Sequence, residues 1–183
     1  AVGARAWSSA RAARAVGAET LPAADGPAPA LAEDELAAAL LAARILAYGQ
    51  GMAVIAAASE EYGWDIDLAR VAEIWRAGCI IRSALLDDIA SAVRAGLPHG
   101  LLHLAPAFAG PLAEGLPALR RLVGQAAIAG LPVPGFAAAL GYAETMRRAR
   151  GTADLIQAQR DFFGRHGFAR RDAKGVHHGP WAG

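Results

Sequence analysis

A stripe of large apolar residues runs through residues 32–62 with the spacing of an α-helix. Its members are Leu41, Ile45, Tyr48, Met52 and Ile55, and successive members lie four, three, four and three residues apart. Because an α-helix has about 3.6 residues per turn, this spacing places the stripe on one face, which has to be buried against another element. No segment shows a convincing alternation of period two, the pattern typical of strands. The chain is therefore expected to be all-α.

The same reasoning predicts helices over residues 2–18, 67–94, 111–129, 136–150 and 152–163, with a short apolar turn near residues 101–104. Asp65 or Asp67 can cap the helix over residues 67–94, and Gly78 can kink it. Residues 21–29 contain three prolines and a glycine, which indicate a linker. A length of 183 residues suits one domain. We expect a single helical domain of about six to seven helices over residues 1–164. An extended tail over residues 165–183 is expected to dock on a partner subunit.

Composition excludes several classes of protein. The formal net charge is +1, with acids and bases interspersed, so there is no basic stripe for nucleic acid to follow. The longest apolar stretches, residues 36–43 and 45–59, are separated by Arg44 and interrupted by Gln50. They fall short of the roughly 18 uninterrupted apolar residues of a membrane span. The single cysteine, Cys79, lies in an apolar run, which indicates a reduced, buried thiol and a cytoplasmic protein.

The first residues are rich in arginine and serine and contain no acid before Glu19, which superficially matches a mitochondrial transit peptide. The first residue is Ala1 rather than methionine. We therefore expect an excerpt or a truncated product rather than a presequence.

Arg160 and His166 lie six residues apart at the end of an apolar helix. An arginine offers a fork of donors to a phosphate, and a nearby histidine adds a donor at another angle. No carboxylate lies three or four residues from Arg160 on its helix, and the adjacent Asp161 faces elsewhere. From the residues alone, a surface arginine with a buried stem is the better explanation of Arg160.

Arg82 and the histidines of the tail could also suggest a functional site, but a structural role explains them better. Arg82 continues an apolar stripe that includes Trp75 and Ile89, so we expect a buried arginine paired with groups of another helix. No metal site is expected at His166, His177 and His178. The chain has no second thiol, and the three histidines do not have the spacing of metal ligands on a helix.

Four motifs together resemble the C-terminal helical domain of 6-phosphogluconate dehydrogenase, the decarboxylating, NADP-linked enzyme of the pentose phosphate pathway. They are LIQAQRDFFGRHGF at residues 155–168, IWRAGCIIRS at residues 74–83, ARAWSSARAAR at residues 4–14 and the ending GVHHGPW. The resemblance runs almost from end to end. It implies that Arg160 and His166 reach into a neighbouring subunit and bind the sugar phosphate substrate, 6-phosphogluconate.

The resemblance also assigns Arg5 and the tail. The family's first helix reads roughly A-V-F-A-R, here with Gly3 in place of the aromatic residue, so Arg5 inherits a contact with the same phosphate. His178 and Trp181 match the family's tail, whereas His177 and Gly179 depart from it. The tail is expected to join the subunits of a homodimer, with Trp181 as the anchor.

The family's catalytic groups are missing from this chain. The lysine that acts as base, the glutamate that assists protonation, the lysine-glycine-threonine-glycine signature and the glycine-rich dinucleotide fingerprint all precede the region covered here. We therefore expect no catalytic, cofactor-binding or metal-binding residue in this chain, NADP bound by a missing N-terminal domain, and no activity of the chain alone. The alternative is a stand-alone helical interaction module that has lost catalysis.

Overall fold

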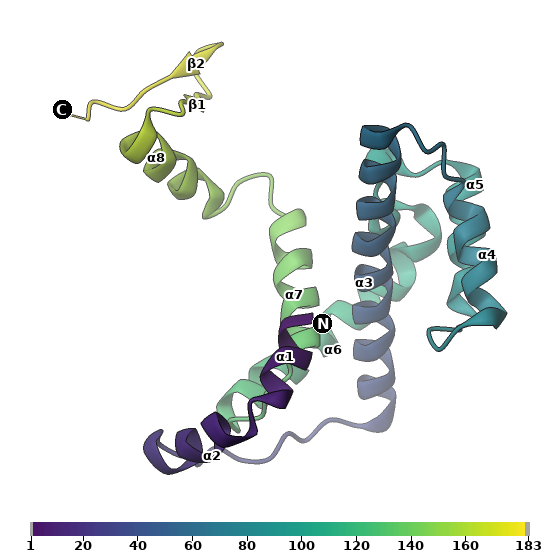
Figure 1. Ribbon diagram of the computed structural model, residues 1–183, viewed down its shortest axis with the longest axis vertical. Helices are drawn as coiled ribbons and strands as arrows, with labels where there is room; N and C mark the ends of the chain where they lie inside the picture. The colour runs from purple at the N-terminus through teal and green to yellow at the C-terminus, as the bar shows by residue number, and fades with distance from the viewer. Residues whose placement is uncertain (1, 182–183) are drawn as a thin grey trace. The chain divides into compact units, whose positions relative to one another are not determined.

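The computed structural model describes residues 2–181, and its architecture is all-α, as predicted (Figure 1). Eight α-helices, two 3-10 turns and one short hairpin make up these residues: α1 (Val2–Ser9), α2 (Arg11–Thr20), α3 (Glu33–Tyr62), α4 (Leu68–Gly78), α5 (Leu85–Ala95), η1 (Pro98–Gly100), η2 (Leu102–Leu104), α6 (Pro106–Ile128), α7 (Pro134–Met146), α8 (Ala153–Gly164), β1 (Phe168–Ala169) and β2 (Val176–His177).

The core forms where α3 packs on α6. Ile45 and Met52 of the predicted stripe are buried there, whereas Leu41 remains 38% exposed. Small residues let the two helices approach closely: a Cβ placed on Gly115 of α6 would lie 2.5 Å from the carbonyl oxygen of Ala38 on α3. Alanines supply more than half of the buried apolar residues, so close helix contact replaces large side chains as the source of buried area.

The helix predicted over residues 67–94 is two helices, α4 and α5, joined by residues 79–84. Asp67 caps α4 as expected, because its Oδ1 accepts the Arg70 N–H at 3.1 Å. After Gly78, Cys79 adopts an extended backbone and ends the helix. The Tyr48 hydroxyl of α3 then donates to the Ile81 carbonyl at 2.6 Å, which stabilises the connection.

This break corrects two side-chain predictions. Arg82 lies in the connection and is exposed, so the prediction of a buried, paired arginine is wrong. Cys79 is half-buried rather than fully buried, and its thiol donates to the Trp75 carbonyl at 3.2 Å. In both cases the residue has left the buried face that a continuous helix would have given it.

Helix boundaries differ from prediction in two further places. The first helix divides at Ala10 into α1 and α2, and the Ser8 and Ser9 hydroxyls donate to carbonyls of α1 at 2.7 Å just before the break. Helix α6 begins at Pro106 rather than at residue 111, since a proline suits a first turn that has no intrahelical N–H partner. The earlier start lets Phe108 join the core.

Helix α3 is long and apolar enough to cross a membrane by length and composition alone. The central helix of a folded core has the same properties. Here Ala39, Ala42 and Ile45 of α3 are fully buried within the protein. This burial accounts for the apolar residues on one face of α3.

The chain divides into two compact units, residues 1–143 and residues 144–183. The first contains α1 to α6 and most of α7. The second contains α8 and the antiparallel hairpin of β1 and β2, in which Phe168 pairs with His177 and Ala169 with Val176. The hairpin is the part of the tail that sequence periodicity did not predict, because each strand has only two residues.

Candidate functional site

The end of α8 carries two of the three predicted phosphate-binding residues. Arg160 lies in the last turns of the helix and is exposed, and its Nη1 donates to Gln157 Oε1 at 3.3 Å. No carboxylate pairs with Arg160 among the residues that the structure describes. His166 follows the C-cap and is also exposed. Both cationic or donor groups are therefore open to an anion.

The turn after α8 has a tightly defined backbone. Arg165 caps the helix in the left-handed region with φ of +51°, and its N–H donates to the Asp161 carbonyl at 2.8 Å. The His166 ring folds back over Gly164: a Cβ on that glycine would lie 2.6 Å from Nε2 of His166. The place of the imidazole thus depends on the absence of a side chain at Gly164.

The carboxylate of Asp161 binds several residues of the tail that follows α8. It is 0% exposed and accepts four hydrogen bonds. Oδ1 accepts from the Gly167 N–H at 2.8 Å and from Nδ1 of His178 at 2.6 Å. Oδ2 accepts from the Gly179 N–H at 2.8 Å and from Nε1 of Trp181 at 2.6 Å. One side chain therefore holds both ends of the hairpin.

These contacts define the charge state of Asp161. Burial raises the pKa of its carboxyl, but the hydrogen bonds from Gly179, His178, Trp181 and Gly167 outweigh burial and bring the pKa far below the ordinary value of 3.8. The group is a carboxylate at neutral pH. Because a carboxylate only accepts, Nδ1 of His178 carries the proton of that hydrogen bond.

Arg5, the third predicted phosphate ligand, lies in the other unit. It is exposed on α1, and its carbonyl accepts the Ser8 hydroxyl at 2.7 Å. The structure thus places Arg160 and His166 at the same end of α8. It places Arg5 on a helix whose side chains are all exposed where they are described.

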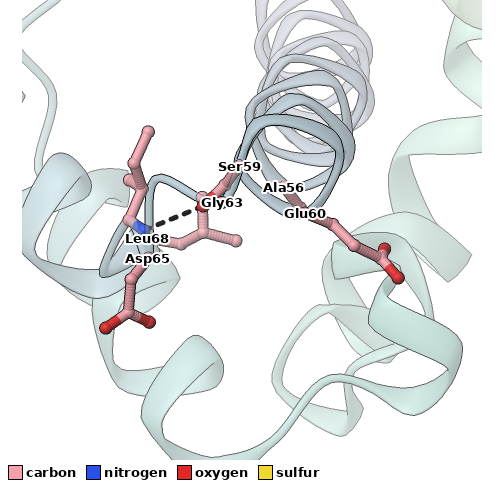
Figure 2. Close-up of a pocket in the computed structure, with 7 residues that line it drawn as sticks. Ala56, Ser59, Glu60, Gly63, Asp65 and Leu68 are labelled. Atoms are coloured by element: carbon pink, nitrogen blue, oxygen red, sulfur yellow. Dashed lines mark hydrogen bonds between the residues drawn. The ribbon is translucent and has the colours of Figure 1, made fainter.

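A cavity of about 410 Å³ lies where α3 meets α4 (Figure 2). Its polar groups are Ser59, Glu60 and Asp65, and the two carboxylates point away from each other (Figure 2). The Ser59 hydroxyl is already used, since it accepts the Ile66 N–H at 2.8 Å. The cavity therefore lacks the converging polar groups of a catalytic site.

A second cavity, of about 790 Å³, lies beside α8 in the second unit, and three arginines line it. Two of them are paired: Arg150 with Asp154 at 3.5 Å, and Arg170 through Nε with Asp172 at 2.8 Å. Their charges are largely compensated. The third, Arg171, has no described acid partner, and neither has Arg160. The end of α8 is the stronger candidate for binding a phosphate, because His166 supplies a second donor there.

The remaining tail residues have local partners. Trp181 is 40% exposed and stacks edge-on against Phe162, with ring centroids 5.6 Å apart. His177 Nε2 lies 3.2 Å from the Lys174 carbonyl. Residues 2–181 contain no group of three metal-ligating side chains.

The sequence interpretation missed Asp161, which it placed on a face away from any site. The partners of Asp161 lie 6, 17, 18 and 20 residues downstream, so no helical spacing connects them. Only the fold of the tail brings them together.

The chain is similar to proteins of one known family. A family model described as the 6-phosphogluconate dehydrogenase C-terminal domain matches residues 1–181. The chain is 44% identical over 149 residues to the decarboxylating 6-phosphogluconate dehydrogenase 2, chloroplastic, of Spinacia oleracea, covering 81% of this chain and 28% of that one. It is 44% identical over 143 residues to the decarboxylating enzyme of Escherichia coli K12, covering 78% of this chain and 31% of the relative.

A solved structure of Plasmodium falciparum 6-phosphogluconate dehydrogenase, described in apo form and in complex with its cofactor NADP+ and its substrate 6-phosphogluconate, superposes with a TM-score of 0.74. The two are 38% identical, and the match covers 81% of this chain and 32% of the other. The chain thus spans about a third of the length of these relatives.

Proposed function

The chain belongs to the family of the 6-phosphogluconate dehydrogenase C-terminal domain, and we propose that it forms the substrate-phosphate-binding and dimerisation part of such an enzyme. The parent enzyme would oxidise and decarboxylate 6-phosphogluconate to ribulose 5-phosphate, with NADP as the hydride acceptor. The observation that carries the proposal is the end of α8. There Arg160 and His166 are both exposed, and no described acid neutralises Arg160.

In this proposal Arg160 supplies a charged fork of donors to the phosphate oxygens. His166 adds a second donor from the turn after the helix, and Arg5 adds a third contact from α1 of the neighbouring subunit. Binding energy at the phosphate, remote from the carbons that react, would orient the sugar acid for chemistry performed elsewhere.

Residues 2–181 contain no dinucleotide-binding fold. The sheet in residues 2–181 is one short antiparallel hairpin, whereas a dinucleotide fold needs parallel strands with crossover helices. NADP would therefore be held by the N-terminal domain of the parent enzyme. The isolated chain is expected to oxidise 6-phosphogluconate with neither NADP nor NAD.

Dimerisation is proposed from the second unit. Large apolar side chains are exposed there, among them Leu155, Phe162 and Phe163, and a second copy of the chain would cover them. We also place the protein in the cytoplasm, in keeping with the unpaired Cys79. The plant relative carries the word chloroplastic in its name, so a plastid is the competing compartment.

The phosphate site can be tested in a chimera in which this chain replaces the matching part of the Escherichia coli enzyme. We expect Arg160→Ala, His166→Ala and Arg5→Ala each to raise the KM for 6-phosphogluconate about tenfold or more. The reason is that charge-assisted hydrogen bonds contribute about 1.5–3 kcal/mol each. The KM for NADP should not change.

Arg148→Ala is the matched control, since Arg148 is an exposed arginine of the same unit outside the site. A normal KM for 6-phosphogluconate in Arg160→Ala would show that the assignment is wrong. The alternative function, a helical interaction module without catalysis, predicts a chimera that folds but never turns over.

A further inference from the structure

Asp161 stands out among the polar side chains of the described residues because it is fully buried in a unit that has no apolar core. Of residues 144–181, only Asp161 and Gly167 are buried. The second unit is therefore held together largely by hydrogen bonds to one carboxylate. That carboxylate is the direct neighbour of Arg160 in the chain.

We propose that Asp161 is the positioning residue of the phosphate site, holding His166 and the tail in the arrangement that binds the substrate phosphate. This inference rests on the proposed function of Arg160 and His166. Asp161 would not contact substrate, since its two oxygens are already occupied by four donors.

The backbone around His166 is bound to Asp161. The main-chain carbonyl of Asp161 accepts the N–H of Arg165, and its side chain accepts the N–H of Gly167. The N–H groups of the two residues on either side of His166, Arg165 and Gly167, are thus tied to a single residue of the helix. The His166 ring lies beside Gly164, at the end of α8 that carries Arg160.

The far end of the tail is also bound to Asp161. His178, Gly179 and Trp181 return to the same carboxylate, so the hairpin is closed as a loop over the helix end. Loss of these bonds would release residues 165–181 together, because no apolar core remains to hold them. His166 would then lose its position relative to Arg160.

The four partners of Asp161 determine which side chain can stand at this position. All four partners are donors, so the site needs a group that only accepts. An asparagine has nearly the same shape, but its NH2 group would face either the Gly167 and His178 donors or the Gly179 and Trp181 donors. Asp161→Asn therefore keeps the volume of the side chain and removes the arrangement of acceptors.

The test uses the same chimera. Asp161→Asn should raise the KM for 6-phosphogluconate about tenfold while the kcat and the KM for NADP stay within about twofold of the parent chimera. Asp154→Asn is the matched control, an exposed carboxylate on the same helix, and should leave the KM for 6-phosphogluconate unchanged. Hydrogen exchange should show faster exchange of the Gly167 and Gly179 amides in Asp161→Asn only.

Trp181→Phe provides a milder second variant in case Asp161→Asn does not fold. It keeps an aromatic ring against Phe162 and removes one donor to Asp161, so a smaller rise, of about threefold, in the KM for 6-phosphogluconate is expected. A rise in this KM alone supports the proposal. An unchanged KM in a folded Asp161→Asn chimera, an unchanged KM in Trp181→Phe if Asp161→Asn does not fold, or an equal effect on both substrates, overturns it.

The two hypotheses fail in different ways. If Arg160→Ala and His166→Ala leave the KM for 6-phosphogluconate normal, the phosphate site itself is wrong. If those two variants raise the KM and Asp161→Asn does not, only the positioning role is wrong.

Discussion

At the crossing of α3 and α6, the absence of a side chain at Gly115 determines how closely the two helices approach. A Cβ on Gly115 would meet the Ala38 carbonyl oxygen at 2.5 Å and Ala42 Cβ at 2.6 Å, and the first is backbone that cannot rotate away. We expect Gly115→Ala to lower the free energy of unfolding by about 1–3 kcal/mol, as overpacking of a core does. Urea unfolding of the full chain measures this.

Gly124 on the same helix is the control, because a Cβ there meets nothing within 4 Å. Gly124→Ala should leave the free energy of unfolding unchanged or raise it by about 0.5–1 kcal/mol, since alanine is the better helix former. Equal effects of the two substitutions would contradict the role assigned to the close approach at Gly115.

The burial of individual charged side chains was the feature that the sequence predicted least well. Arg160 and Asp161 are adjacent and charged, and helical spacing distinguishes their faces, but it does not show that Asp161 is buried. Burial of Asp161 depends on donors that return to it from up to 20 residues away. The prediction for Arg82 was wrong in the opposite sense. It assumed that one helix continues past residue 82, whereas α4 ends at Gly78 and Arg82 is exposed.

Among the elements, the hairpin of β1 and β2 depends most directly on pH. The pKa of Asp161 is lowered in the folded tail, because four hydrogen bonds outweigh the effect of burial. The resulting stability is fully present above the ordinary pKa of 3.8. It is lost as the pH falls below that value toward the folded pKa, since the released tail then takes up a proton.

The indole N–H of Trp181 reports this transition directly, because it donates to Asp161. Its exchange with water should be slow at about pH 6 and should accelerate between about pH 4 and about pH 2, as one proton is bound. Asp161→Asn should show fast exchange throughout this range. Exchange that stays equally slow from about pH 6 to about pH 2 in the parent protein would contradict the role of the carboxylate.

Elements with strong period-3.6 patterns were predicted well: α3, α7 and α8 begin and end within a few residues of their expected bounds. The breaks were not predicted. The connection at residues 79–84 is stabilised by a bond from Tyr48 to the Ile81 carbonyl, 33 residues apart, and the hairpin by bonds to Asp161. Such long-range contacts leave no period in the sequence.

At the scale of the whole molecule, the second unit exposes large aromatic side chains of a kind that an isolated domain normally buries. Phe163 is 81% exposed and Phe162 is 58% exposed, and the ring of Phe162 is the one that Trp181 contacts. The sequence predicted Trp181 as an anchor on another subunit. In the structure it bonds to α8 of its own chain, and the docking of the tail on a partner remains a prediction.

We expect the chain to self-associate through this surface of the second unit, because a second copy can cover apolar side chains that the chain itself does not. Sedimentation velocity of the intact chain should give a larger species than a chain ending at Gly164, which lacks the hairpin and Trp181. Phe163→Glu tests the surface without truncation: at 81% exposure the ring contributes little to the fold of its own unit, so the variant should fold and sediment as a monomer. Arg148→Glu, at an exposed position outside the apolar surface, controls for the added negative charge and should still associate. Identical monomeric profiles for the intact and the truncated chain would refute self-association through the tail, and an associating Phe163→Glu would move the interface away from α8.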